Sequence, residues 1–217
     1  MTVPARPKIY HIVHLDNLAS IVADGGLLSD ADMANRNEAS VIGMSGIKQR
    51  RRSLQIHCRP GLFVGDCVPF YFCPRSIMVY IIHCANHPNL SYQGGQAQIV
   101  HLEFDMREIV EWAENNSRRW AFTLSNAGAN YFEDSCDLAR LEEINWDAVS
   151  SNRWSGPGVE RSIKEGKQAE FLVETRVPWR LIRRIGVHSQ AIAAQVAQCF
   201  GRAERGPTLE IRPDWYY

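Results

Sequence analysis

The order of strand-like and helix-like segments is the feature that most constrains the fold of this 217-residue chain. β-branched and aromatic runs are mixed with amphipathic stretches, but the two kinds do not alternate regularly. Such a mixture favours an α+β domain over a doubly wound parallel sheet. No Gly-x-Gly-x-x-Gly follows a predicted strand and no Gly-x-x-x-x-Gly-Lys-Ser/Thr occurs. The two common nucleotide-binding motifs are therefore absent, and the length suits one domain with one core.

Strands are predicted where short apolar, β-branched or aromatic runs are bounded by turn residues. They cover residues 8–15, 68–73, 98–104, 119–123, 169–173, 181–187 and 208–212. Helices are predicted from apolar residues at helical spacing and from capping residues. They cover residues 17–23, about 40–52, 77–83, 106–115, 137–150 and 190–200. Residues 152–165 are predicted to be a connection.

Five positions are expected to begin or end helices. Asp16, Ser76 and Ser189 each precede a predicted helix, and their side-chain oxygens can accept hydrogen bonds from its free backbone N–H groups. Gly25-Gly26 and Gly201 follow predicted helices, and glycine readily adopts the left-handed conformation that ends a helix.

The overall charge gives no support for bulk nucleic-acid binding, because Lys+Arg and Asp+Glu both number 24. A local basic patch stays possible. No apolar run approaches the roughly 20 residues that cross a bilayer, and the N-terminus lacks the apolar segment of a signal peptide. A cytoplasmic protein without membrane contact is expected. The six cysteines include no Cys-x-x-Cys pair, so free thiols are expected. We expect no metal, with a scattered zinc site at His57, Cys58, Cys84 and His87 as a minor alternative.

Residues 29–66 form a long polar segment with a basic cluster, Lys48-Gln-Arg-Arg-Arg52. A segment this long with little periodicity is usually functional or mobile in a compact domain. The arginines have two interpretations. They belong to a solvated loop, or one guanidinium binds a diphosphate through paired charge-assisted hydrogen bonds.

Glu170 lies within the strand predicted for residues 169–173, in the segment Lys167-Gln-Ala-Glu-Phe-Leu-Val173. By strict alternation it shares a face with Leu172, while Phe171 faces the other way. From this pattern alone, a solvent-facing carboxylate is the simpler interpretation. The alternative is a carboxylate that a rigid strand directs into a cleft, where proton abstraction needs a fixed direction.

Two further segments offer candidate ligand-binding side chains. His11 and His14 flank a predicted strand that leads into a helix, and His11 could donate to a ribose hydroxyl or a phosphate. Lone strand histidines are more often structural. Tyr71 is expected to point opposite Phe70 and could stack on a flat ring, although most residues in such a run belong to the core.

Four segments, in this order, resemble the DarT-type DNA ADP-ribosyltransferase toxins. They are Ile9-Tyr-His-Ile-Val-His-Leu-Asp-Asn-Leu18, Gln49-Arg-Arg51, Val68-Pro-Phe-Tyr-Phe-Cys-Pro-Arg-Ser76 and Lys167-Gln-Ala-Glu-Phe-Leu-Val173. The segment Arg212-Pro-Asp-Trp-Tyr216 is also similar to that family. The resemblance runs from residue 8 to the C-terminus.

The resemblance implies one ADP-ribosyltransferase domain over residues 1–217, with a split, bent β-core, peripheral helices and NAD in the cleft between the sheets. It implies transfer of ADP-ribose from NAD to a base in single-stranded DNA. By position, Glu170 and Arg51 match the catalytic residues. The implied NAD-binding residues are His11, Ile12, Asn17, Leu18, Gly25, Arg51 and Tyr71. A loop at about residues 38–66 would cover NAD and help form the DNA groove.

The implied DNA contacts are Lys48, Arg50, Arg52, Arg75, Ser76 and Asn126. At Phe122-Thr-Leu-Ser-Asn126 the chain departs from the thymine-modifying pattern, since Asn126 replaces a histidine. An amide presents its donor and acceptor in a different geometry from imidazole. The target base stays open between guanine and thymine, with guanine favoured.

The resemblance also implies a partner, an antitoxin that removes ADP-ribose, and a monomer is expected. Two alternatives stay open for the function. The acceptor could be RNA, protein or water, or the fold could hold a nucleotide without catalysis.

Overall fold

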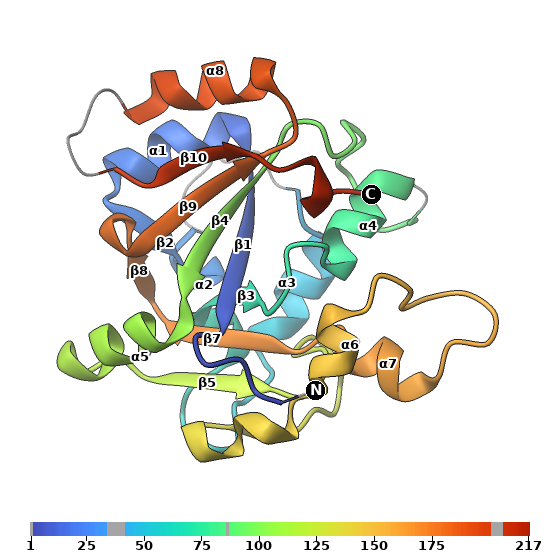
Figure 1. The fold of residues 1–217 in the computed structure, drawn as a ribbon. Helices are drawn as coiled ribbons and strands as arrows, with labels where there is room; N and C mark the ends of the chain where they lie inside the picture. The colour runs from blue at the N-terminus through green and yellow to red at the C-terminus, as the bar shows by residue number, and fades with distance from the viewer. Residues whose placement is uncertain (1, 34–41, 86, 201–205) are drawn as a thin grey trace.

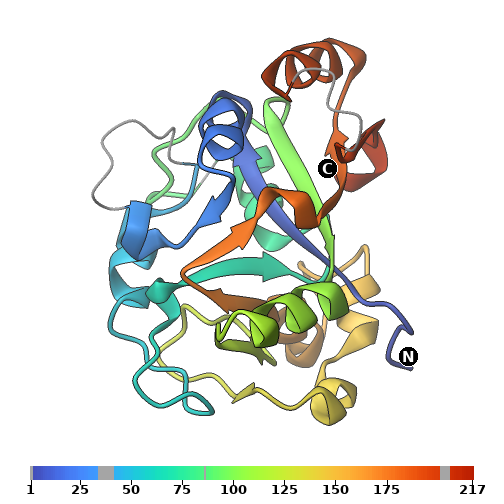
Figure 2. The ribbon, with the colours of Figure 1, turned by 90° about the vertical axis from the view of Figure 1, so that its left-hand side faces the viewer.

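A large, bent β-sheet forms the centre of the structure (Figures 1 and 2). The computed structural model describes residues 2–33, 42–85, 87–200 and 206–217. Within these residues the large sheet has the order β10-β9-β4-β1-β3-β7-β5-β6, and β2 pairs with β8 in a small second sheet. The strands are β1 (Lys8–His14), β2 (Gly26–Leu28), β3 (Cys67–Tyr71), β4 (Ile99–Asp105), β5 (Trp120–Thr123), β6 (Asp134–Ser135), β7 (Glu170–Glu174), β8 (Arg176–Pro178), β9 (Ile182–Val187) and β10 (Thr208–Ile211).

The large sheet is split between β1 and β3. β1 pairs with β4 along its whole length, from Lys8 opposite Asp105 to His14 opposite Ile99. Its register with β3 is limited to Tyr10 opposite Tyr71. β3 pairs along its full length with β7. The strands on the two sides of this junction run in different directions in Figure 1, as predicted for a split, bent β-core.

Helices lie around the sheet rather than alternating with its strands (Figure 1). α8 connects β9 to β10, which pair in parallel, and it packs against α1. Residues 152–165 were predicted to be a connection. This prediction was wrong for residues 161–165, which belong to α7. The helices are α1 (Leu18–Ala23), α2 (Asp30–Met33), α3 (Ser45–Arg51), α4 (Ile77–Cys84), α5 (Met106–Asn115), α6 (Trp146–Ser150), α7 (Arg161–Gly166) and α8 (Gln190–Phe200).

Two of the three predicted helix caps are confirmed. The hydroxyl oxygen of Ser76 accepts a hydrogen bond from the N–H of Val79 at 3.4 Å. Ser189 accepts one from the N–H of Ile192, also at 3.4 Å. Each bond satisfies a backbone donor that has no partner within the helix.

The prediction that Asp16 caps α1 was wrong. A 3₁₀ turn, Leu15–Asn17, precedes the helix, and it is the ring of His14 that accepts a hydrogen bond, from the N–H of Asp16 at 3.2 Å. Gly25 does end the helical turn, at a φ of 72° that favours glycine. Gly201 and residues 38–41 of the predicted loop lie outside the described residues.

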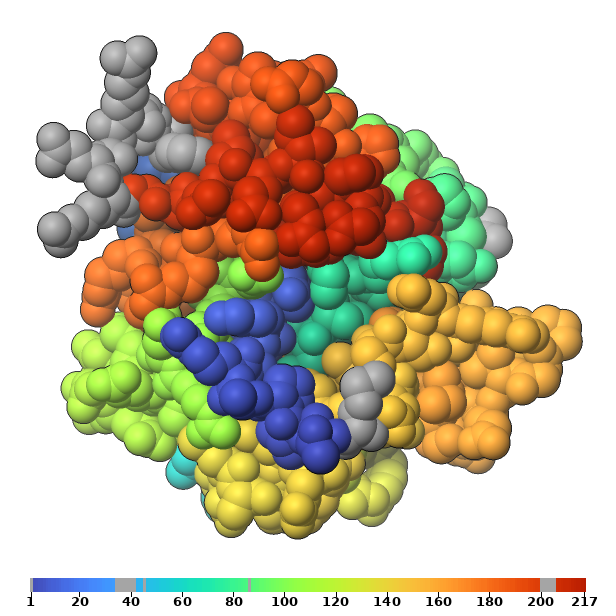
Figure 3. Space-filling model, in the orientation of Figure 1, coloured from blue at the N-terminus to red at the C-terminus, as the bar shows by residue number. Residues whose placement is uncertain are grey.

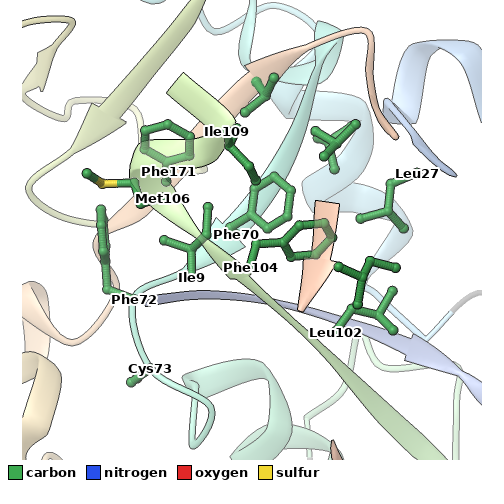
Figure 4. Packing of buried hydrophobic residues seen from close by; sticks show 14 of the residues in the cluster. Ile9, Leu27, Phe70, Phe72, Cys73, Leu102, Phe104, Met106, Ile109 and Phe171 are labelled. Atoms are coloured by element: carbon green, nitrogen blue, oxygen red, sulfur yellow. The ribbon is translucent and has the colours of Figure 1, made fainter. Parts of the chain in front are cut away.

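Aromatic side chains fill the core beside β3, β4 and β7 (Figure 4). Phe70 and Phe104 are fully buried, and their rings meet edge to face at 5.1 Å. On β7, Phe171 belongs to this main cluster, whereas Leu172 packs in a second cluster on the other side. β7 is therefore buried on both faces, which fixes the direction of Glu170.

The N-terminal residues and the segment around β10 lie on the same face of the molecule (Figure 3). In the described part of the chain, no helix has both the length and the apolar character needed to span a membrane.

Candidate active site

A cavity of about 490 Å³ lies where the two parts of the sheet meet. β1, β3 and β7 contribute to its walls, together with α1, β2, α2 and α3. Its volume is in the range of sites that bind cofactors or small ligands. The cavity thus occupies the junction at which the resemblance places NAD.

Arg51 and Glu170 form a buried ion pair in the wall of this cavity. The two terminal nitrogens of Arg51 donate to the two carboxylate oxygens of Glu170, at 3.1 and 2.9 Å. Only 7% of Arg51 and 3% of Glu170 is exposed. Burial acts to lower the pKa of Arg51, but the charge and hydrogen bonds of Glu170 outweigh it, so the net shift is upward. Arg51 therefore stays charged and holds the carboxylate in one orientation.

Glu170 has two further contacts, one with the last residue of β5 and one with the segment that follows this strand. The N–H of Ala127 donates to its Oε1 at 3.2 Å. Its own N–H donates to the hydroxyl of Thr123 at 3.1 Å. The pattern of alternation favoured an exposed carboxylate, and this was wrong because α3 and the segment after β5 both cover that face of β7. No pattern in the sequence indicates that Thr123 or Ala127 contacts Glu170.

His11 lies in the cavity wall as a neutral acceptor. Its Nδ1 lies 2.7 Å from the carbonyl oxygen of Pro69. A carbonyl oxygen only accepts, so Nδ1 carries the proton. Burial lowers the pKa of His11, which keeps the ring neutral. Its Nε2 can then accept from a ribose hydroxyl, whereas the sequence-based prediction was a donor to a hydroxyl or phosphate.

The structure brings most of the predicted NAD-binding residues together. Leu18 is an exception, because it is fully buried in the main core. Gly25 is another, because it turns the chain beside the cavity without lining it. His14 packs between Asp16 and Gln98 and is structural. The predicted residues that line the cavity are His11, Ile12, Asn17, Arg51 and Tyr71.

The basic side chains of α3 and of Arg52, which follows it, have different surroundings. Lys48 and Arg52 line the cavity, and Lys48 pairs with Asp30 of α2 at 2.8 Å. Arg50 is exposed and lies near the turn at Gly128, where an added Cβ would be 3.9 Å from its Nη2. Of these three predicted DNA contacts, Arg50 and Arg52 are exposed and Lys48 is half-buried.

Arg75 and Ser76 follow β3 on the far side of Tyr71. The guanidinium of Arg75 lies over the ring of Tyr217 at 4.3 Å and donates to the side chain of Asn152 at 3.4 Å. Ser76 is fully buried. Its hydroxyl caps α4, so the predicted contact between this side chain and DNA does not fit its burial.

Asn126 uses both ends of its amide within the protein. Its nitrogen donates to the side chain of Gln168 at 3.2 Å. Its oxygen accepts from the N–H of Gly128 at 2.7 Å. Because Ala127 in the same turn donates to Glu170, the turn that carries Asn126 also contacts the Glu170 carboxylate.

The minor zinc alternative has no geometric support. His57 and Cys58 both donate backbone N–H groups to the carboxylate of Asp134. All six cysteines are free thiols. Among the residues that the structure describes, no group of three or more His, Cys, Asp or Glu side chains is arranged to hold a metal ion.

The family model described as "DarT: ssDNA thymidine ADP-ribosyltransferase, DarT" matches residues 10–217. The chain belongs to the DarT family. A DarT relative from Thermus sp. (strain 2.9), named DNA ADP-ribosyl transferase, is 35% identical over 219 residues, which cover 100% of this chain and 99% of the relative. A relative of the same name from Thermus aquaticus is 33% identical. The match covers 99% of this chain and 90% of that relative.

Solved DarT structures are similar over the whole chain. Thermus sp. 2.9 DarT in complex with ADP-ribosylated ssDNA has a TM-score of 0.88 at 34% identity, covering 100% of this chain and 99% of that one. The same protein in complex with NAD+ has a TM-score of 0.83 at 33% identity, covering 100% of both chains. The predicted ADP-ribosyltransferase fold and the NAD-dependent ADP-ribosyltransferase class are thereby confirmed.

Proposed function

We propose that this DarT family member transfers ADP-ribose from NAD to thymidine in single-stranded DNA, with Glu170 and Arg51 as its catalytic residues. The observation that carries this proposal is the buried fork of Arg51 on Glu170, set in the wall of a cavity of about 490 Å³. Buried ion pairs are costly to assemble unless their hydrogen bonds are satisfied. A charged pair held in a ligand-sized cavity is therefore a strong candidate for catalysis.

The cavity residues suit NAD. Arg51 keeps its buried Nε free of partners within the described residues, so this N–H can donate to an oxygen of the ligand. His11 offers an acceptor for a ribose hydroxyl. Tyr71 offers an aromatic face for a flat ring, and the apolar side chains of Ile12 and Leu27 complete part of the wall.

The chemistry follows from charge. When the bond between nicotinamide and ribose breaks, its electron pair leaves with nicotinamide and positive charge develops on the ribose. A fixed carboxylate beside that ribose, Glu170, stabilises this charge more in the transition state than in the ground state. As a ring nitrogen of the base bonds to C1′ of the ribose, Glu170 takes the proton that this nitrogen loses. Arg51 stays protonated, so it orients Glu170 and does not act as a base.

Thymidine is the acceptor that the family description favours. The sequence had favoured guanine because Asn126 replaces a histidine. In the structure the Asn126 amide is engaged by Gln168 and Gly128, so this side chain alone does not specify guanine. Single-stranded oligonucleotides with one thymidine or one guanosine among adenosine and cytidine separate the two bases. Mass spectrometry should find one ADP-ribosyl group on the thymidine oligonucleotide, and an adduct on guanosine alone would overturn the assignment.

The same experiment, repeated with Asn126→His, tests whether this position selects the base. Labelled NAD offered to DNA, RNA and protein together tests the acceptor class. Label on DNA supports the proposal, whereas label only on RNA or protein, or free ADP-ribose, would replace DNA by another acceptor or by water.

Basic side chains could guide the DNA strand to this site. The proposed groove consists of the exposed Arg50, the half-buried Arg75 and the loop at about residues 38–66, of which residues 38–41 lie outside the described residues. Phosphate contacts of this kind weaken as salt rises. The partner implied by the resemblance, an enzyme that removes ADP-ribose from DNA, is part of the proposal. Co-expression of such a hydrolase should restore growth to cells that this protein arrests.

A further inference from the structure

Thr123, the last residue of β5, lies next to the catalytic strand without lining the cavity. It is fully buried. The pairing of β5 with β7 runs from Trp120 opposite Val173 to Phe122 opposite Phe171. The pairing with β7 ends before Thr123, although Thr123 still pairs with Asp134 of β6 on the other side of β5. The backbone N–H of Glu170, the first residue of β7, therefore donates to the hydroxyl of Thr123 and not to a backbone carbonyl of β5.

This hydroxyl makes two hydrogen bonds at once. Its oxygen accepts from the N–H of Glu170 at 3.1 Å. Its proton is donated to the carbonyl oxygen of Ser125 at 2.6 Å. Both capacities of the hydroxyl are used, so it joins the backbone of Glu170 to the first residue of the following turn.

The turn that Thr123 holds returns to the Glu170 side chain. Two residues after Ser125, the N–H of Ala127 donates to Oε1 of Glu170 at 3.2 Å. Arg51 holds the same carboxylate from α3. The carboxylate is thus fixed by Arg51 on one side and by the turn on the other, and Thr123 sets where the turn lies.

We infer that Thr123 is a positioning residue for ADP-ribose transfer: its hydroxyl fixes the backbone of Glu170 and the turn that holds the Glu170 carboxylate. This inference rests on the proposed catalytic role of Glu170. A displacement of a catalytic group by about 1 Å can slow a reaction by about 100-fold. We expect the loss of both hydrogen bonds of Thr123 to permit a displacement of this kind.

The test compares Thr123→Val with Thr123→Ser. Valine keeps the shape but removes both hydrogen bonds, whereas serine keeps the hydroxyl. We expect Thr123→Val to lower kcat by about 10- to 100-fold while the KM for NAD stays within about twofold of wild type, because Thr123 does not line the cavity. Thr123→Ser should restore kcat to within about threefold of wild type. Thr208→Val, on the exposed start of β10, is the matched control and should leave kcat unchanged.

A wild-type kcat in folded Thr123→Val, or equal losses in the valine and serine variants, would overturn the inference. Removing the hydroxyl leaves the buried N–H of Glu170 without its partner, so the valine variant could melt below the assay temperature. In that case Ala127→Pro removes the other link, the N–H that holds Oε1. A wild-type kcat in folded Ala127→Pro would then overturn the inference.

Failure of the proposed function is distinguishable from failure of this inference. If the wild-type protein modifies no DNA, the proposed acceptor is wrong. Release of nicotinamide from NAD then becomes the measured rate, and the same variants are compared on it. A slow Thr123→Val with a restored Thr123→Ser supports the positioning role on either measurement.

Discussion

Arg51 and Glu170 lie 119 positions apart in the sequence and meet through two parallel hydrogen bonds of 3.1 and 2.9 Å. The pair connects α3, in the polar segment, to the buried strand β7. The same polar segment lines the cavity with Lys48 and Arg52. Any movement of α3 is therefore transmitted to the carboxylate that we propose as the catalytic group.

Arg51→Lys should lower kcat by about 100-fold with the fold intact. One ammonium group cannot make the two parallel bonds of a guanidinium, so Glu170 loses its fixed orientation. Gln49→Ala, at an exposed position on the same helix, is the matched control and should stay near the wild-type rate. Steady-state transfer of labelled ADP-ribose to an oligonucleotide measures both. Near-normal activity in Arg51→Lys would show that the charge suffices without the fork.

The protein should lose stability as pH falls from 7 to 5, in part through His101. Burial lowers the pKa of His101 to about 4, although its hydrogen bond to the carbonyl of Pro74 opposes the shift. In the unfolded chain His101 becomes protonated near pH 6.5, whereas in the folded protein it stays neutral down to about pH 4. The stability due to neutral His101 is therefore complete above about pH 6.5 and is lost towards pH 4, with about 2 kcal/mol lost between pH 7 and 5.

Urea unfolding at pH 7 and pH 5 checks this expectation. His101→Gln can still donate to Pro74 but does not titrate, so its stability should fall less than that of wild type. His83→Gln, on the exposed side of α4, is the control and should keep the wild-type decline. Equal declines in wild type and His101→Gln would contradict the assignment.

Gly186→Ala should destabilise the protein by about 1–3 kcal/mol. A Cβ at Gly186 would lie 2.2 Å from the indole of Trp215. Trp215 is 3% exposed and is flanked by the guanidinium groups of Arg184 and Arg212, so the indole has little room to move. Gly46→Ala meets nothing within 4 Å and is the control. Thermal unfolding measures both, and an unchanged midpoint in Gly186→Ala would show that the C-terminal segment can shift.

Arg50→Gln should weaken binding of single-stranded DNA and make it less sensitive to salt. If Arg50 contacts one phosphate, the slope of log affinity against log salt should become shallower by about 0.7. Fluorescence anisotropy at several salt concentrations gives this slope. Arg161→Gln is a suitable control, since Arg161 is an exposed arginine of α7 that pairs with Glu165. An unchanged slope in Arg50→Gln would remove Arg50 from the DNA groove.

Elements with local signals could be predicted from the sequence. α5 begins and ends where expected, because Asp105 caps it and its apolar residues recur at helical spacing. Ser76 and Ser189 fix their helices in the same way. The strands β2 and β8 were not predicted. Each is only three residues long, and the two pair across a long sequence separation, with Gly26 opposite Pro178.

The sequence predicted which residues form the site better than it predicted their contacts and burial. The motif around Glu170 identified it through resemblance, while alternation favoured exposure. Burial of Glu170 depends on Arg51 and Ala127, which are remote in sequence, and no local pattern encodes that contact. The burial of Ser76 and the internal hydrogen bonds of Asn126 likewise depend on packing that the sequence does not display.

Single-turnover transfer from labelled NAD to a thymidine-containing oligonucleotide tests the central claim most directly, with Glu170→Gln compared against Glu174→Gln. Glu174 lies on the same strand and forms its own ion pair, with Arg119 at 2.6 Å. We expect Glu170→Gln to lose at least about 1,000-fold in rate, because it loses both the negative charge and the proton acceptor. Glu174→Gln should remain within about threefold of wild type. Equal rates in Glu170→Gln and wild type would contradict the claim that Glu170 carries the reaction.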